Sequence, residues 1–216
     1  MKMYKMYIEK LFRSLEMYIS KYYHIKVRFG LIGFGGDCIH SDAHFHTLNG
    51  QLKGRYIDLS SGLQHLNFTK RTNDDVVSAV KFAMQFPFES DYKSILVLTD
   101  AEPAQSADMT AMAKELFYKG VFLNVIKRPR QSMEPSMVNE GTRADNLDMF
   151  LTDAHSNIVK RGYVWNADFM TSQFATFYKS FLKYFGFELK QLQKSCFNCQ
   201  CQVGPAQLGR TSCQLC

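Results

Sequence analysis

Most cysteines of this chain lie at its C-terminal end. Five of the six fall between residues 196 and 216, in the pattern Cys196-x2-Cys199-x-Cys201-x11-Cys213-x2-Cys216, and the sixth is Cys38. Without Cys201, the pattern is two Cys-x-x-Cys pairs separated by 13 residues, close to the spacing of a zinc ribbon. The fifth cysteine does not fit a four-thiolate site, whereas an even total allows three disulfides of unknown pairing. On spacing alone, both zinc binding and disulfide bonding stay open.

Residues 38–46 hold a second group of potential metal ligands. Cys38, His40, His44 and His46 are of types that bind zinc. His44 and His46 are expected on the same side of a strand, because side chains alternate along it. A zinc site would need all four side chains to converge at about 2 Å from the ion. We favour the simpler interpretation of a polar loop that leads into a hairpin.

No motif in the sequence indicates catalysis. The chain contains no Gly-x-Ser-x-Gly elbow, no phosphate-binding loop and no His-Glu-x-x-His pair. The segment Gly33-x-Gly35-Gly36 leads into the predicted hairpin, whereas a phosphate site requires a helix N-terminus at that point. We therefore expect no enzymatic activity and no bound cofactor.

The composition is that of an ordinary globular protein. Of the 216 residues, 46% are apolar and 21% are charged. The net charge is +6, but the basic residues are spread along the chain, whereas a nucleic-acid footprint is usually concentrated on one face. No apolar run approaches the ~18 residues of a membrane span, and the first 20 residues carry charges where a signal peptide would be apolar. We expect neither nucleic-acid binding nor a membrane span.

The order of predicted elements is that of an α/β fold. Apolar residues recur every three or four positions over 4–22, which predicts an amphipathic helix. Apolar runs predict buried strands at 25–34, 94–99 and 121–126, and Asn49-Gly50 predicts a turn between strands 45–48 and 51–57. Further helices are expected after Asp58, after residues 73–74, and over 107–119 and 168–185, with short strands at 148–151 and 158–165.

Strands that alternate with helices predict a mostly parallel sheet covered by helices on both faces. Any site carried by loops should then lie beyond the carboxyl ends of the strands, where the loops 35–42, 69–74 and 100–106 are expected to meet. The change in cysteine content near residue 190 divides the chain into an α/β domain, 1–190, and a small cysteine-rich tail, 191–216.

The segments RFGLIGFGG, TNDDVVSAVKFAM, SILVLTD and GVFLNVI, in this order, resemble a von Willebrand factor A-type domain, a Rossmann-like fold, over about residues 1–188. The resemblance implies that the first, central strand, which would lie between the strands at 25–34 and 94–99, is missing. Its absence would leave two apolar strand edges unpaired. We therefore expect Met1 to be an artificial or predicted start, with upstream polypeptide supplying the strand.

The same resemblance assigns cation binding in this family to an Asp-x-Ser-x-Ser loop, a threonine and an aspartate. Thr72 and Asp100 stand at the positions of the threonine and the aspartate, and the Asp-x-Ser-x-Ser element is absent. Mg²⁺ needs six oxygen ligands, of which these two residues supply at most two side chains. We expect no working cation site within this chain.

A narrower resemblance rests on LIGFGGDCIHSDAHFHTLNGQLKG and CFNCQCQVGPAQLGRTSCQLC, which are similar to the C-terminal region of arthropod apolipophorins, members of the large lipid transfer protein family. It implies a secreted, extracellular interaction or structural module of a hemolymph lipid-transport lipoprotein. Its partners would be the remainder of its own polypeptide and other proteins or receptors, with lipid met only indirectly.

This second resemblance also bears on modification. It favours disulfides over zinc, with the pairing unknown, among Cys38, Cys196, Cys199, Cys201, Cys213 and Cys216. In a secreted chain, Asn67 of the triplet Asn67-Phe68-Thr69 becomes a candidate glycosylation site. Two alternatives stay open: an intracellular A-domain scaffold with a zinc-binding tail, and a metal-dependent adhesion module if the missing strand carries the cation motif.

Overall fold

The computed structural model describes residues 4–35, 42–66, 76–101, 103, 107–127, 142–143, 158 and 162–184. Its helices are α1 (Lys5–Tyr23), α2 (Tyr56–His65), α3 (Val76–Ala83), α4 (Met109–Tyr118) and α6 (Ala167–Ser172), after which residues 174–184 are also helical. Its strands are β1 (Leu31–Gly33), β2 (His44–His46), β3 (Lys93–Thr99), β4 (Val121–Lys127), β5 (Thr142–Arg143) and β6 (Gly162–Asn166).

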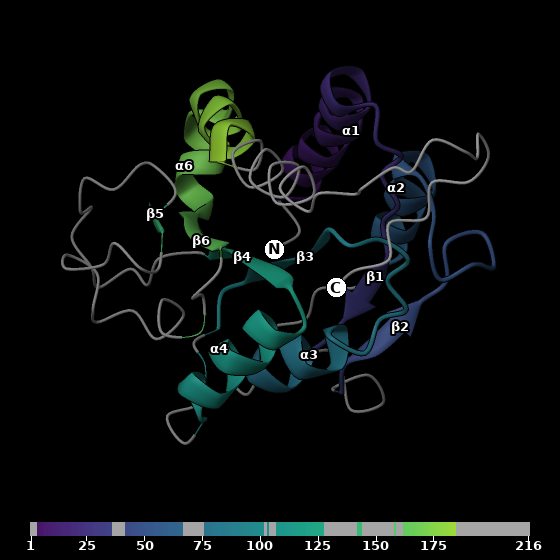
Figure 1. The fold of residues 1–216 in the computed structure, drawn as a ribbon. Coiled ribbons are helices and arrows are strands. Elements are labelled where there is room, and N and C mark those ends of the chain that lie inside the picture. The colour runs from purple at the N-terminus through teal and green to yellow at the C-terminus, as the bar shows by residue number, and fades with distance from the viewer. Residues whose placement is uncertain are drawn as a thin grey trace, which may run out of the picture.

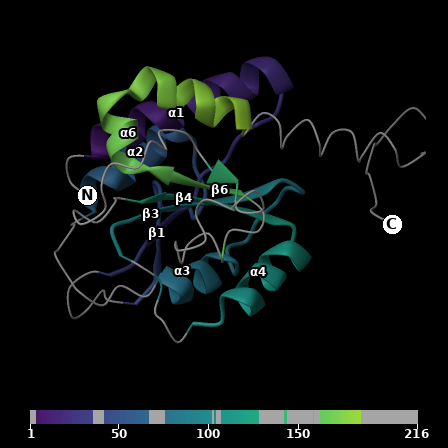
Figure 2. The same ribbon diagram turned by 90° about the vertical axis from the view of Figure 1, so that its left-hand side faces the viewer.

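Two apolar cores lie on opposite faces of the strands. α1, α2, α6 and residues 174–184 cover one face and form the α1 core, whereas α3 and α4 cover the other and form the α3 core (Figure 1 and Figure 2). Side chains alternate between the two, so that Leu96 and Leu98 of β3 join the α1 core while Ile95 and Val97 join the α3 core. The fold is therefore α/β with helices on both faces, as predicted.

Four strands pair in the order β3-β4-β6-β5. β3, β4 and β6 are parallel to one another, and β5 runs antiparallel to β6. Thr99 lies opposite Lys127, and Lys127 lies opposite Asn166, so the three parallel strands end at the same edge of the sheet. The central strand, β4, is buried from Val121 to Ile126. The parallel arrangement predicted from the alternation of strands and helices is confirmed for these three strands.

β1 and β2 form a separate antiparallel pair, in which Leu31 faces His46 and Gly33 faces His44. Like β3, β1 contributes to both cores: Leu31 packs against the α1 core, and Ile32 packs against the α3 core. β1 therefore lies in the same layer as β3. Within the described part of the chain, however, the two strands belong to different sheets and are not hydrogen-bonded to each other.

The turn predicted at Asn49-Gly50 is confirmed. Both residues have positive φ values, 50° and 74°, and the backbones of Leu48 and Gln51 exchange hydrogen bonds of 2.6 and 3.0 Å across the turn. The strand predicted to follow over 51–57 is wrong, because α2 begins at Tyr56. The carboxylate of Asp58 accepts the N–H of Arg55 at 2.9 Å and so satisfies a donor at the start of this helix.

Two further predicted elements are less regular than expected. The strand predicted over 25–34 is limited to Leu31–Gly33 and an isolated bridge between Phe29 and Gly54. The last helix is interrupted at Gln173, whose φ and ψ are −131° and 50°. Just before this break, the hydroxyls of Thr171 and Ser172 both donate to the carbonyl of Asp168, at 3.1 and 2.7 Å. Such local side-chain bonds compete with the regular helical ladder and bend helices.

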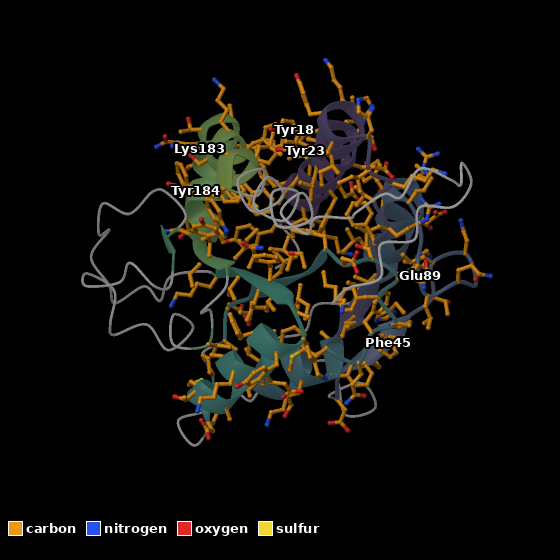
Figure 3. The ribbon with its side chains drawn as sticks, viewed as in Figure 1. Tyr18, Tyr23, Phe45, Glu89, Lys183 and Tyr184 are labelled. Atoms are coloured by element: carbon orange, nitrogen blue, oxygen red, sulfur yellow. The ribbon has the colours of Figure 1, made fainter. Side chains whose placement is uncertain are left out.

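Tyrosine side chains connect α1 to the C-terminal helical residues. The hydroxyl of Tyr4 donates to Asp168 at 3.0 Å, and the hydroxyl of Tyr178 donates to the carbonyl of Ser14 at 3.2 Å. At the other end of α1, the rings of Tyr18 and Tyr23 lie 6.0 Å apart (Figure 3). Burial, and then the hydrogen bond to Tyr18, raise the pKa of Tyr23 to about 12. Tyr23 thus stays protonated at any physiological pH and takes part in packing rather than in proton transfer.

Candidate functional site

The interruption between β1 and β3 is the clearest candidate site among the described residues. We name it the β1–β3 slot; it is bounded by Leu31–Gly33 on one side and by Lys93–Thr99 on the other. β3 has β4 on one edge and no described strand on the other, and β1 has only β2 beside it. Figure 1 places the labels of β3 and β1 next to each other, with β4 beyond β3 and β2 beyond β1.

Burial confirms that both strands are less covered here than inside the sheet. All three residues of β1 are half-buried, and in β3 Leu96 and Leu98 are half-buried, whereas the corresponding central strand β4 is buried along almost its whole length. Leu31, Ile32, Leu96 and Leu98 carry large apolar side chains, so their partial exposure leaves hydrophobic surface in contact with water. The strand predicted to be buried on both faces, 94–99, is buried on the face towards the α3 core and half-buried on the face towards the α1 core.

The chemistry of the slot is that of an open sheet edge. A strand edge presents a row of backbone N–H and C=O groups that require hydrogen-bond partners. An added polypeptide strand satisfies them by main-chain bonding, and its alternate side chains then enter the layers above and below the sheet. Because Leu96 faces one core and Val97 the other, an occupant of this slot must be apolar on both of its faces. The site suits a buried strand better than a small polar ligand.

Of the two positions that the resemblance relates to cation binding, Thr72 and Asp100, the structure describes only the aspartate. Asp100 directly follows β3 and is exposed, while Thr72 lies outside the described residues. The neighbouring Thr99 is buried, and its hydroxyl oxygen accepts the N–H of Ala101 at 3.0 Å. Among the residues that the structure describes, no three His, Cys, Asp or Glu side chains are placed to hold a metal ion together. Asp100 is the one described carboxylate directly after β3, and the absence of a working cation site, which needs six oxygens, stays a prediction.

His44 and His46 lie on the same side of β2, as predicted, with ring centroids 4.7 Å apart. Across the hairpin they face Gly33, which had not been expected to belong to this group. A Cβ atom at Gly33 would lie 2.7 Å from Nε2 of His46 and 3.1 Å from Nε2 of His44. This contact follows from the register of β1 against β2. The Asn49-Gly50 turn does not determine that register, because the turn joins Leu48 to Gln51. Cys38 and His40 lie outside the described residues.

The remaining predicted site residues lie outside the described part of the chain. These are Asn67, the tail cysteines Cys196, Cys199, Cys201, Cys213 and Cys216, and the strand predicted over 148–151. Disulfide bonding, zinc binding by the tail, glycosylation and the division at residue 190 therefore stay predictions. Within the described residues, no helix combines the length and the apolar character needed to cross a membrane.

Comparison with known proteins gives no relative on which to base an assignment: no family model, no curated protein and no solved structure matches this chain. The function must therefore be inferred from the residues and the geometry described above.

Proposed function

We propose that this chain is a non-enzymatic interaction and structural module whose β1–β3 slot receives one strand from another polypeptide segment. The observation that carries the proposal is that β1 and β3 contribute side chains to the same two cores without pairing with each other. One intervening strand requires about 9–10 Å between β1 and β3, twice the ordinary spacing of hydrogen-bonded strands. Its side chains would cover the half-exposed leucines on β3.

The order of the strands supports a more specific proposal, a von Willebrand factor A-type fold. With the slot included, the order is β2-β1-slot-β3-β4-β6-β5. In the A-type domains that the sequence resembles, the first strand lies between the equivalents of β1 and β3. This agreement makes the remainder of the chain's own polypeptide the proposed source of the strand. A strand held by covalent linkage binds at a high effective concentration, so it needs little intrinsic affinity.

The proposed setting is extracellular, as part of a lipid-transport lipoprotein similar to the arthropod apolipophorins. The support for this step is the similarity of the two quoted segments and the cysteine content of the tail. In that setting the module would hold parts of the particle together or contact other proteins, and the lipid would be bound elsewhere.

Strand addition predicts a distinctive hydrogen-exchange pattern in β3. In a parallel pair, alternate amides of β3 bond to β4, and the others point towards the slot. We expect the slot-facing amides to exchange fast in the free chain and to become protected when a lysine-flanked peptide copying residues 94–99, Ser-Ile-Leu-Val-Leu-Thr, is added. The measurement is hydrogen exchange followed by mass spectrometry with residue-level fragmentation.

The matched control is the same peptide with alternate backbone nitrogens methylated. It keeps every side chain but cannot donate along one edge, so it is expected to protect the β3 amides at least tenfold less well. Equal protection by the methylated peptide would show that binding does not depend on strand pairing. Slot-facing amides that are already protected in the free chain would contradict the proposal outright.

The extracellular setting predicts oxidised cysteines. When the protein is purified from its natural source and treated with iodoacetamide without reduction, we expect few or none of the six thiols to be alkylated, because disulfides form and persist in oxidising compartments. Intact-protein mass spectrometry counts the added groups. Five or six alkylated cysteines accompanied by bound zinc would overturn the extracellular proposal and support an intracellular module with a zinc-binding tail.

A further inference from the structure

We infer that the solvent side of α1 is a docking surface for an acidic amphipathic helix of a partner protein. We name it the α1 outer face, and its residues on this helix are Met6, Lys10, Arg13, Met17 and Lys21, all of them exposed. The β1–β3 slot lies within the sheet layer, on the other side of the α1 core, so the inference does not depend on what the slot receives.

The five residues form one row along the axis of α1. They are spaced by four, three, four and four positions, so each stands about one helical turn beyond the one before it. Anchors with this spacing are typical of the contact between two helices. The buried side of α1 already packs into the α1 core. The row is therefore a second contact surface, which the fold of the chain itself does not use.

The carboxylates of α1 are turned away from this row. Glu9 accepts the hydroxyl of Ser60 at 3.2 Å, and Oε1 of Glu16 lies 3.6 Å from Nε of Arg55. Both contacts are made with α2 or the residue that precedes it, so the two acidic side chains face α2. The outer face keeps three cations of α1 without an acidic residue in their row, and its charge is positive throughout.

Residues 174–184 add positive charge beside α1. This segment lies next to the helix, with the rings of Tyr7 and Phe174 5.7 Å apart (Figure 1). It contains no acidic residue, and its Lys179 and Lys183, one turn apart, are both exposed. Basic residues that are far apart in the sequence are thus brought to neighbouring helical segments by the fold.

The combination of charge and apolar surface defines the partner. Met6 and Met17, 53% and 63% exposed, lie in the same row as the cations, about 16 Å apart at the rise of an α-helix. A helix that lies in a lipid surface keeps its apolar residues and its cations on opposite faces, and the apolar face of α1 is in the core. A partner helix with carboxylates between two apolar side chains matches both features. Methionine, which is flexible, suits such contacts.

The probe for the test is a fluorescently labelled, alanine-based helical peptide of about 20 residues, long enough to be helical in water. It carries two leucines at the spacing of Met6 and Met17, and glutamates on the same side between them. Fluorescence anisotropy is expected to show saturable binding to the chain, which weakens as salt is added. At low salt, Arg13→Glu and Lys179→Glu should each raise the Kd at least fivefold, and Met17→Gln at least threefold.

The matched control is Lys114→Glu. It changes the net charge as much as Arg13→Glu does, but Lys114 is exposed on α4, which covers the other face of the sheet. This variant should bind the peptide within twofold of the parent. A second peptide, with glutamines in place of the glutamates, should bind at least fivefold more weakly than the first. Far-UV circular dichroism establishes that each variant is folded.

The inference is overturned if the parent does not bind the acidic peptide, or if Arg13→Glu and Lys114→Glu weaken binding equally, because net charge alone would then explain it. It is also overturned if vesicles of phosphatidylcholine and phosphatidylserine, or single-stranded DNA, bind the parent more tightly than the peptide does and bind Met17→Gln equally well. The α1 outer face would then contact a polyanion through charge alone.

Discussion

Gly162→Ala is expected to lower the free energy of unfolding by more than about 4 kcal/mol, a loss of the size seen only for a few specific defects. A Cβ at this position would lie 1.8 Å from the carbonyl oxygen of Leu123 in the neighbouring strand, and Gly162 itself has a φ of 153°. Leu123 and Gly162 are the first pair of the β4–β6 ladder. Because the obstacle is backbone, the alanine can be accommodated only by moving β6 away from β4.

Gly120→Ala is the matched control for this substitution. Gly120 also has a positive φ, 65°, but a Cβ there would meet no atom within 4 Å. Its expected loss is therefore only the conformational term, about 1–2 kcal/mol. Urea denaturation followed by the fluorescence of Trp165, the single tryptophan of the chain, measures both variants. Equal losses would mean that backbone conformation, rather than the contact with Leu123, makes glycine necessary at position 162.

Elements with a strong local signal could be predicted from the sequence. The apolar spacing of Ile8, Leu11, Leu15 and Ile19 gives α1 one buried face, and each of these side chains is buried in the structure. The helix predicted over 107–119 is also present as α4, with Asp108 accepting the N–H of Ala111 at 2.8 Å as its N-cap. Gly120, which has a positive φ, follows the C-terminal end of this helix. In these cases residues close in sequence determine the conformation.

Elements that depend on distant partners were predicted less well. The apolar run at 25–34 has strand-forming residues throughout, yet it is strand only where β2 lies beside it. Residues 45–48 were expected to pair with 51–57 across the Asn49-Gly50 turn, whereas His44–His46 pairs with Leu31–Gly33. Hydrophobic periodicity indicates which side of a strand is buried, but it does not state which other strand provides the hydrogen bonds.

In the candidate sites, too, the features set by neighbouring residues could be predicted, and the features set by distant strands could not. The shared side of His44 and His46 follows from the alternation of side chains and was predicted, whereas the position of Gly33 beneath them depends on the register between β1 and β2. The β1–β3 slot was expected from a family resemblance, and the structure shows its two edges in separate sheets. In the proposed function a second segment occupies the slot, and neither the periodicity of β1 nor that of β3 specifies the sequence of that segment.

Trp165→Ala is expected to destabilise the chain by about 3–5 kcal/mol, the usual loss for removing a large buried aromatic side chain. Trp165 is 1% exposed and lies in the α1 core, where its ring centroid is 5.4 Å from that of Phe177 and 5.3 Å from that of Phe181. Trp165 is therefore a main contact between β6 and residues 174–184, beside the pair of Tyr163 and Tyr184, whose ring centroids lie 4.7 Å apart. Urea denaturation followed by far-UV circular dichroism measures the change, because the variant has no tryptophan.

Trp165→Phe separates the packing of the ring from the chemistry of its N–H group. Within the described residues, the buried Nε1 of Trp165 has no hydrogen-bond partner, and a buried donor left unsatisfied costs about 1–3 kcal/mol. Phenylalanine loses part of the ring volume but also removes this unsatisfied donor, so we expect it to be less destabilising than alanine by at least about 2 kcal/mol. Both variants lack the indole N–H, so the difference between them measures the packing of the ring that phenylalanine keeps. Equal destabilisation would contradict the expectation, because it would mean that a ring at position 165 adds little to the α1 core.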